Sequence, residues 1–356
     1  MDSTTKPKNN MKKLLILAAL IGLASCTAEL NPQSKTEDVT LTVSVKSNDV
    51  LTKATDVGDP NESNVNNIQV FVFKKNVDVY VFEAAAKANA NSLPITVTTG
   101  EKDVIILVNE PSDYTGLTDR NAILSNISSL ADNSPSSLVM FGEASSTVTT
   151  SSHNISIPVT RLASRVTVKK ITNKLRNGNA TKNVKVSRVF LTNAGATSTY
   201  GFTRGGFYAT TGINTHLDFN GISLSDTAEK DAVNALIYKN INADIGENAS
   251  YTTPVVLYGY ANDKAIKPTR LVVEMAIAGR YFTYPIELPA MAPNHTLEVT
   301  EIVITSVGNI SNGDDYIDDG EDTPVTFLEA TFTLNVQPWT IVTVSNETGG
   351  TNNYTI

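Results

Sequence analysis

Hydrophobic and polar residues alternate most regularly near the start of the chain. Hydrophobic side chains occupy every second position there, and these are Val39, Leu41, Val43 and Val45. Threonine, serine and lysine fill the positions between and after them. Because successive side chains of a strand point to opposite faces, the pattern predicts a β-strand with one buried face. Residues 47–67 have loop character, so we expect an exposed linker between this strand and the next.

Short apolar runs recur along the rest of the chain. Those that we expect to be strands are 68–73, 77–82, 103–108, 155–159, 166–171, 184–191, 255–260, 271–277, 281–288, 297–304 and 330–336. The continuous run at 103–108 is typical of a strand buried on both faces. Ala278 and Gly279 fit a hairpin turn between two of the runs. The pattern predicts an all-β fold class, with two antiparallel β-sandwich domains.

One short helix is expected in the first domain. Thr118 is a candidate N-cap, since its side chain can accept a hydrogen bond from the first helical turn. Ile123, Ile127 and Leu130 follow at helical spacing, and Asp132 marks the expected end.

The first 25 residues have the layout of a secretory signal. Lysines precede an apolar core of eleven residues, 14–24, which is too short to span a membrane. Cys26, the only cysteine, stands directly after a small-residue tripeptide. A cysteine in that position resembles the lipobox of bacterial lipoproteins, where the thiol is alkylated by a diacylglycerol and becomes the mature N-terminus. We therefore expect residues 1–25 to be a lipoprotein signal peptide and Cys26 to be lipidated.

Composition narrows the possible functions. A hydrophobic content of 41% with 18% charged residues is typical of a globular chain. The formal net charge of -8 argues against nucleic acid as a partner. With one cysteine and three histidines, a structural zinc site is not expected. We find no catalytic constellation, and we interpret His295 as part of a turn that leads into a strand. We expect no enzyme activity and no cofactor.

An acidic run and a pair of arginines have structural interpretations. The run 314–322 holds six carboxylates that could bind calcium, but Tyr316 stands where an EF-hand loop needs a ligand, so we favour a solvated acidic loop without a metal. Arg161 and Arg165, four residues apart, are expected to share one face of a strand and to contact acidic groups between the two domains.

The order of segments suggests a precursor that is activated by proteolysis. A cut after Lys53 in the linker would release the strand of residues 39–45 from the first domain. The exposed groove would then require a replacement strand, and a neighbouring molecule could supply one. A chain that donates a strand at one end and accepts one at the other forms an open head-to-tail polymer. The alternative is that Lys53 is an ordinary solvated lysine.

Several segments in order along the chain resemble a known family. They are 39–47 with 52–54 and 57–59, then 68–73, 138–141, 161–166, 294–299 and 334–339. Behind a lipobox, this series resembles the fimbrillins of the Bacteroidales, the lipoprotein-derived type V pilins of the FimA/Mfa kind.

The resemblance implies a fold and a way of processing. Each domain would be a transthyretin-like β-sandwich, with residues 26–53 as a lipidated propeptide, 54–159 as the N-terminal domain and 160–356 as the C-terminal domain. A trypsin-like protease would cut between Lys53 and Ala54 after transport to the outer membrane. The C-terminal tail would donate a strand to the next subunit through Ile341, Val342, Val344, Tyr354 and Ile356.

The resemblance also implies a role at the cell surface. The chain would be a shaft subunit of an extracellular fimbria that supports adhesion, with other copies of itself and minor fimbrial subunits as partners. An anchor subunit that keeps its lipid, or a tip subunit, is one alternative. Another is a monomeric glycan-binding lipoprotein, for which aromatic residues near two glycines form a candidate cluster: Tyr200, Phe202, Phe207 and Tyr208.

Overall fold

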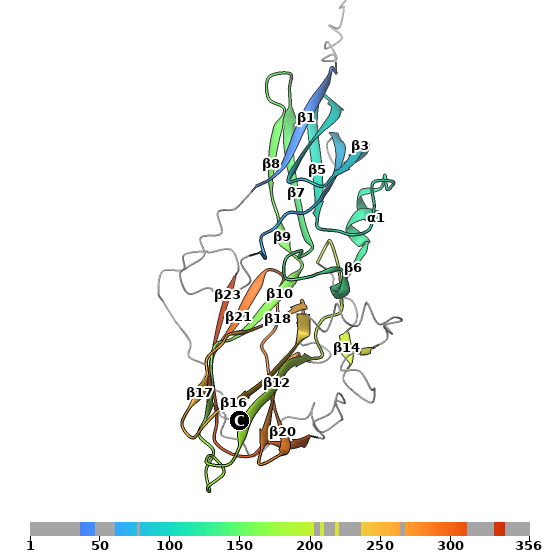
Figure 1. Ribbon diagram of the computed structural model, residues 1–356. Coiled ribbons are helices and arrows are strands. Elements are labelled where there is room, and N and C mark those ends of the chain that lie inside the picture. Colours follow the sequence, from blue (N-terminus) through green and yellow to red (C-terminus); the bar gives the residue numbers. More distant parts are fainter. Residues whose placement is uncertain are drawn as a thin grey trace, which may run out of the picture. The chain divides into compact units, whose positions relative to one another are not determined.

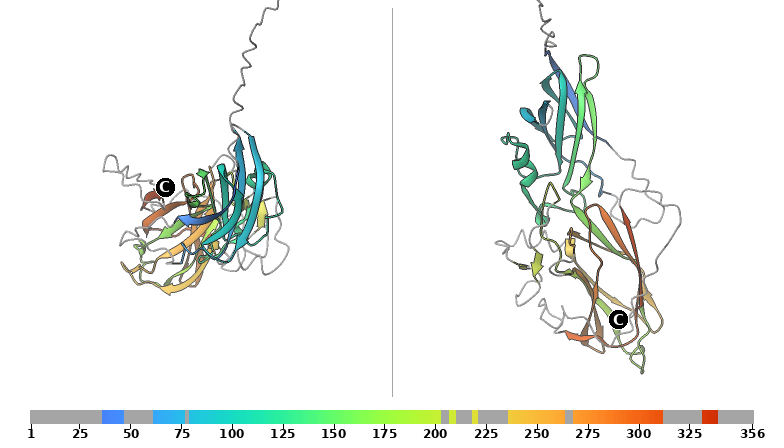
Figure 2. Two further views of the ribbon diagram at one scale, coloured as in Figure 1. Left: turned by 90° about the horizontal axis from the view of Figure 1, so that it is seen from above. Right: turned by 180° about the vertical axis from the view of Figure 1, so that it is seen from behind.

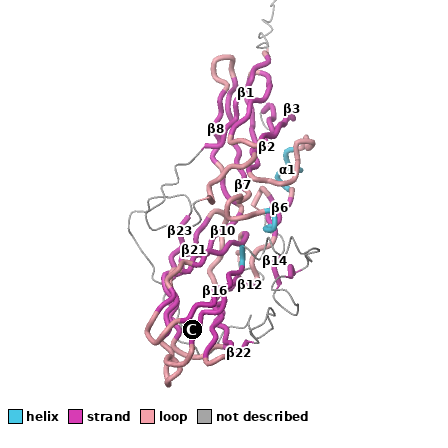
Figure 3. The backbone as a smooth tube through the Cα atoms, viewed as in Figure 1, coloured by secondary structure: helices cyan, strands magenta, loops and turns pink. Residues whose placement is uncertain are grey.

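Strands make up most of the chain that the structure describes, and its helices are short (Figure 3). The computed structural model describes residues 36–46, 61–76, 79–202, 207–209, 218–220, 236–263, 268–311 and 331–338. The predicted all-β fold class is confirmed. Within these ranges, no helix is long and apolar enough to cross a membrane.

Two sheets are built from strands between residues 38 and 161 (Figure 1). The smaller has the order β4-β1-β8, with β1 (Asp38–Lys46), β4 (Ser92–Thr98) and β8 (Asn154–Pro158). The larger has the order β3-β2-β5-β7-β9, with β2 (Ile68–Asn76), β3 (Val79–Ala88), β5 (Gly100–Val108), β7 (Met140–Val148) and β9 (Thr160–Arg161).

A hydrophobic core fills the space between these two sheets. Alternate residues of β1, β4 and β8 contribute to it from one side, and alternate residues of β2 and β5 from the other. The opposite face of β2 and β5 joins a second core, through Phe71 and Ile105 among others. Both faces of β5 are therefore buried, as its continuous apolar run predicts, and Val104 and Ile105 are fully inaccessible to solvent.

Two further sheets are built from strands between residues 163 and 338 (Figure 2). One has the order β17-β11-β21-β10-β18, with β23 also pairing with β21. Its strands are β10 (Ala163–Val168), β11 (Ile171–Asn173), β17 (Ser250–Tyr251), β18 (Val255–Tyr260), β21 (His295–Ile304) and β23 (Thr331–Pro338). The other has the order β16-β12-β19-β20-β22. Its strands are β12 (Val184–Thr192), β16 (Tyr238–Asp244), β19 (Arg270–Ile277), β20 (Arg280–Glu287) and β22 (Asn309–Ser311).

A β-bulge in β12 places a buried ion pair in this second pair of sheets. The register of β12 shifts between Val186 and Arg188 against both of its neighbours. The Arg188 guanidinium lies 2.7 Å from the carboxylate of Glu274 on β19, which is wholly buried. Ser187 also donates to this carboxylate, at 2.7 Å. A charge this deep in the protein requires such a partner, because desolvation penalises an unpaired carboxylate strongly.

The expected helix is shorter than its hydrophobic spacing predicts. Helix α1 covers Arg120–Ser125, and its N-cap is Asp119 rather than Thr118. The chain is extended at Asn126, and β6 (Ile127–Ser129) pairs with β13 (Thr197–Thr199). A 3-10 helix, η1 (Leu130–Asp132), then begins with its own capping box. Pairing with a distant strand therefore overrides the helical spacing, and Ile127 is exposed.

Most predicted strands are present, with some differences. Residues 79–82 of the run expected at 77–82 belong to β3, which continues to Ala88, and residues 77 and 78 lie outside the described residues. The run expected at 166–171 is divided between β10 and β11. Strands β4, β7 and β16 were not predicted, and neither was the short pair β14 (Phe207–Ala209) and β15 (Asp218–Asn220). The domain limits inferred from the sequence stay predictions.

A glycine in β7 permits close packing against the end of β8, and this contact is testable. A Cβ atom on Gly142 would lie 2.4 Å from the backbone oxygen of Pro158. We expect Gly142→Ala to lower the free energy of unfolding by about 1–3 kcal/mol, because backbone must move to relieve the overlap. The matched control is Gly116→Ala, since no heavy atom lies within 4 Å of a Cβ there. Urea unfolding of both variants tests this, and equal stability would contradict it.

Candidate functional site

Strand β1 lies in the middle of its sheet, between β4 and β8 (Figure 1). It pairs antiparallel with β4, from Asp38 opposite Thr98 to Ser44 opposite Ser92. Its other edge runs parallel to β8. A strand in this position bonds on both edges, and β1 does so with β4 from Asp38 to Ser44 and with β8 from Thr42 to Lys46.

The inward face of β1 belongs to the hydrophobic core. Leu41 is 1% exposed and Val43 is 0% exposed, while Val39 and Val45 are half-buried against the same core. The side chain of Thr40, by contrast, is exposed. The alternating pattern in the sequence therefore predicts this strand and its buried face correctly.

Both neighbours of β1 depend on it for backbone hydrogen bonds. In the part of the chain that the structure describes, β1 is the only strand that pairs with β4 and the only one that pairs with β8. Removing β1 would therefore leave an open groove, with unpaired backbone groups on both walls and apolar side chains on its floor. Unpaired backbone groups and exposed apolar surface both favour binding of another strand.

A buried ion pair stands at one end of this groove. Lys102 of β5 is 1% exposed, and its Nζ lies 2.7 Å from the carboxylate of Glu83 on β3. Glu83 also accepts hydrogen bonds from the backbone nitrogen and the hydroxyl of Thr98, each at 2.6 Å. Burial by itself would raise the pKa of Glu83, but the hydrogen bonds from Lys102 and Thr98 hold it below the ordinary glutamate value. Glu83 is therefore ionised at neutral pH.

A second buried carboxylate, Glu62, links the two pairs of sheets. Its side chain accepts from Arg165 of β10 at 2.7 Å and from the hydroxyl of Tyr258 on β18 at 2.5 Å. Arg161 of β9 donates to the backbone oxygen of Glu62 at 3.1 Å and to Asn294 at 3.1 Å. The expected contact with an acidic group is confirmed for Arg165, whereas Arg161 donates to the backbone oxygen of Glu62. The prediction that both arginines share one face of a strand is wrong, because they lie on strands of different sheets.

A further set of hydrogen bonds joins the segment between β5 and β7 to Tyr260 of β18 and to Tyr200. The hydroxyl of Tyr260 lies 2.7 Å from that of Ser128 and accepts from Asn133 at 2.7 Å. Tyr200 donates to the carboxylate of Glu110. Burial raises the pKa of Tyr200 well above its ordinary value, and it also raises that of Glu110. Tyr260 and Tyr200 are both buried, and the hydroxyl of each is hydrogen-bonded, as polar groups in a protein interior usually are.

The structure describes the side chains of two of the four aromatic residues considered for glycan binding. Tyr200 is 0% exposed, and Phe202 is half-buried with its ring centroid 5.9 Å from that of Phe141. These two residues therefore pack against the core. The side chains of Phe207 and Tyr208 lie outside the described part of the structure.

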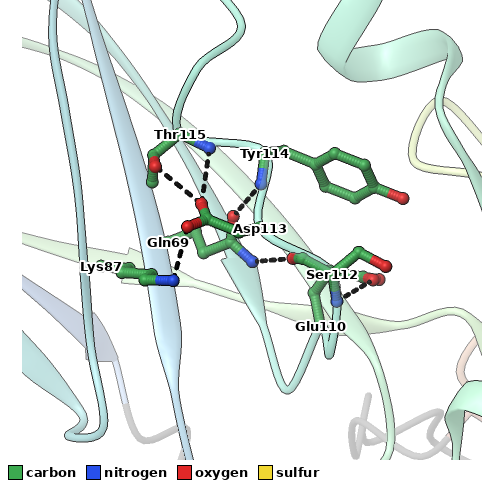
Figure 4. Close-up of polar contacts among 7 residues, drawn as sticks. All are labelled: Gln69, Lys87, Glu110, Ser112, Asp113, Tyr114 and Thr115. Atoms are coloured by element: carbon green, nitrogen blue, oxygen red, sulfur yellow. Dashed lines mark hydrogen bonds and ion pairs between the residues drawn. The ribbon is translucent and has the colours of Figure 1, made fainter.

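A polar cavity of about 340 Å³ lies beside the loop that follows β5. Figure 4 shows that the polar side chains there bind one another and the loop. Asp113 accepts from Lys87 at 2.5 Å and from the hydroxyl of Thr115 at 2.6 Å. Gln69 accepts from the backbone of Tyr114 at 2.8 Å and donates to that of Ser112 at 2.6 Å. These contacts fix the loop and assign no ligand to the cavity.

Two more predictions from the sequence concern His295 and the acidic run 314–322. His295 begins β21 after a turn in which Asn294 has a φ of 57°, and its Nδ1 lies 2.8 Å from the backbone oxygen of Pro293. This agrees with a turn that leads into a strand. The acidic run 314–322 lies outside the described residues.

The remaining predicted site residues also lie outside the described residues. They are the lipidation site Cys26, the processing site at Lys53 and Ala54, and the donor residues Ile341, Val342, Val344, Tyr354 and Ile356. Strand β23 ends three residues before Ile341 and pairs antiparallel with β21. These assignments stay predictions.

Comparison with known proteins identifies the fold. No family model and no curated protein matches the sequence. A solved structure of a candidate cell adhesion protein from Bacteroides eggerthii matches with a TM-score of 0.61 at 16% identity, covering 85% of this chain and 96% of its own. The fimbrilin FimA from Porphyromonas gingivalis matches with a TM-score of 0.55 at 11% identity, covering 86% and 98%. The fold is that of a fimbrilin.

Another match supports the same fold. A second candidate cell adhesion protein, from Parabacteroides distasonis, has a TM-score of 0.53 at 14% identity and is covered completely, at 100% of its chain. A match over 85% of this chain is too long to be confined to one pair of sheets. The fimbrilin fold therefore includes both pairs.

Sequence reasoning predicted one wall of the groove, β8, as the run 155–159, but missed the other wall, β4, and the buried carboxylates Glu83 and Glu62. Strand β4 contains the alternation Leu93, Ile95 and Val97, but Pro94 interrupts the pattern of strand-forming residues. Glu83 and Glu62 carry no local signal, because their partners are far away in sequence.

The burial of β1 leads to a direct prediction. We expect Leu41→Ala to lower the free energy of unfolding of the unprocessed chain by about 2–4 kcal/mol, since Leu41 lies in the core. Thr40→Ala, on the exposed face of the same strand, is the matched control and should change it by about 0.5 kcal/mol or less. Chemical unfolding measures both, and equal effects would show that β1 is not part of the cooperative fold.

Proposed function

We propose that this protein is a subunit of a fimbrial shaft on the cell surface, where it polymerises by exchange of strand β1 and supports adhesion. The precursor is lipidated at Cys26 and held at the outer membrane. A trypsin-like protease cuts after Lys53, β1 leaves its groove, and the C-terminal tail of a neighbouring subunit takes its place. In this proposal the protein has a structural role and no enzyme activity.

The position of β1 is the observation that carries the proposal. It is the first strand among the described residues and yet the central strand of its sheet. A single cut between β1 and β2 therefore separates a complete strand from the rest of the fold. Between Lys46 and Lys74 the chain has one basic residue, Lys53. A protease with trypsin-like specificity has that single site between them.

The free energy that is lost when β1 leaves its groove explains why a replacement strand would bind. Each fully buried side chain of β1, such as Leu41 or Val43, contributes about 1.5–3 kcal/mol through burial. The backbone groups of β4 and β8 lose their partners when β1 leaves, and each hydrogen bond that a replacement strand restores contributes about 0.5–1.5 kcal/mol net of hydration. These contributions hold β1 in place before cleavage and favour any segment that restores both contacts.

The C-terminal tail has a suitable sequence for this role. Val342 and Val344 are two residues apart, as are Tyr354 and Ile356. This spacing places both members of each pair on one face of a strand, as Leu41 and Val43 are on β1. Each subunit would then fill one neighbour and be filled by another, which gives an open polymer.

The fold supports the same proposal. Its solved relatives include a fimbrilin and proteins assigned as candidates for cell adhesion. The formal net charge of -8 and the absence of a recognised catalytic constellation in the sequence agree with a structural protein on the cell surface.

Processing at Lys53 can be tested by substitution. We expect Lys53→Ala to leave the subunit as a lipidated, unpolymerised precursor, because the trypsin-like site is lost. Lys53→Arg is the matched control and should assemble normally. The measurement is mass spectrometry of the N-terminus in material sheared from cells, where assembled subunits should begin at Ala54. A normal fimbrial yield from Lys53→Ala would exclude this bond as the required cut, and assembled material that begins at Cys26 would indicate an anchor subunit.

The donor role of the tail gives a separate prediction. Deletion of residues 341–356 should give a subunit that folds and is processed but forms no polymer, because it has no strand to donate. It should still accept a strand, so mixing it with the full-length subunit should shorten the polymers. Denaturant-resistant high-mass species on gels report both results. Normal polymers from the deleted subunit alone would contradict the mechanism.

A further inference from the structure

Both walls of the β1 groove depend on β1 for all of their strand pairing among the described residues. Strand β8 is connected to β7 through the turn in which Thr149 donates to Ser152 at 2.9 Å, and it continues to β9, which pairs with β7. Strand β4 is connected to β3 and to β5. When β1 leaves, β4 therefore keeps only its side-chain contacts and these two connections.

Two charged side chains of the larger sheet contact Thr98, the last residue of β4. Glu83 accepts two hydrogen bonds from Thr98, and one of them comes from the backbone. Lys102 donates to the Thr98 hydroxyl at 3.1 Å. Thr98 is also the residue that pairs with Asp38, where β1 enters the sheet. These contacts therefore lie at the end of the groove and use none of the atoms of β1.

The local structure of β3 directs Glu83 to this position. Val72 of β2 pairs with Ala84, and Phe73 pairs with Phe82, so Glu83 is the extra residue of a β-bulge. Bulges re-aim a side chain out of the regular alternation of a strand. Lys102 then fixes the carboxylate from β5, and both side chains are nearly inaccessible, at 1% for Lys102 and 9% for Glu83.

We propose that Glu83 is a positioning residue for strand exchange, which holds β4 in register while the groove is empty. The inference rests on the proposed function, in which β1 leaves the groove. The ion pair with Lys102 keeps Glu83 charged and fixed, and Glu83 in turn fixes the end of β4. The incoming strand, a segment of a second copy of this chain, then meets a wall that is already in place.

The test compares Glu83→Gln with a control substitution that weakens a buried ion pair in another part of the fold. Glu274→Gln also weakens a buried ion pair, with Arg188, but it lies in the second pair of sheets. In both variants and the parent chain, Cys26→Ser prevents lipidation, and a recognition sequence for a specific protease replaces residues 50–56. Cleavage is then independent of Lys53 and of the natural protease.

Binding of the released strand is the quantity to measure. After cleavage, the fragment that contains β1 is removed under mild denaturant. The protein is then titrated into a fluorescein-labelled peptide of residues 36–46 held at limiting concentration, and anisotropy gives its Kd. We expect Glu83→Gln to weaken binding by about tenfold, as the loss of a charged hydrogen-bond partner would. Glu274→Gln should leave the Kd of the cleaved parent unchanged, although both variants should lower the Tm of the uncut chain.

A milder variant keeps the test decisive if Glu83→Gln does not fold. Thr98→Val removes the hydroxyl that binds Glu83 but keeps the shape and the backbone nitrogen of Thr98. It should weaken peptide binding in the same direction by a smaller factor. Unchanged binding in the folded Glu83 and Thr98 variants would overturn the inference, and so would equal weakening by Glu274→Gln. Neither outcome depends on whether Lys53 is cut or the C-terminal tail acts as a donor in the cell.

Discussion

The pairing of β1 with β4 on one edge and with β8 on the other is the interaction on which the first pair of sheets depends. Without it, the described chain contains no ladder that joins β4 to β8, and the core between the two sheets loses Leu41 and Val43. A strand at the edge of a sheet could leave at a modest cost. When a strand at the centre leaves, the backbone groups of both neighbouring strands lose their hydrogen-bond partners, and this favours the binding of another strand.

Buried charges in this fold lie where separate elements must be held together. Glu62 joins the segment before β2 to strands β10 and β18, and Glu83 joins β4 to β5 through Lys102. Arg188 and Glu274 join β12 to β19 beside a bulge. A buried ion pair adds little net stability, because desolvation offsets most of the attraction. Its geometry is specific, however, so each pair defines one arrangement of its strands.

Parts of this fold follow from local sequence, and others do not. The alternation in β1 and the apolar run in β5 depend only on side chains close in sequence, and both strands form as the patterns indicate. The helical spacing that includes Ile123 and Ile127 is overridden, because residues 127–129 gain a ladder with β13. Strand β4 was missed because Pro94 weakens its alternating pattern, and because its only strand partner among the described residues, β1, is far away in the sequence.

The sequence by itself determined that the chain is all-β, that its first strand has one buried face, and that a single basic residue follows before β2. Local periodicity and residue type are sufficient for those conclusions. Only the tertiary structure decided that β1 is the centre of its sheet, and that Glu83 and Glu62 are buried with partners from other strands. The reason is physical: these contacts join residues far apart in the chain, and their energies depend on burial that exists only after folding.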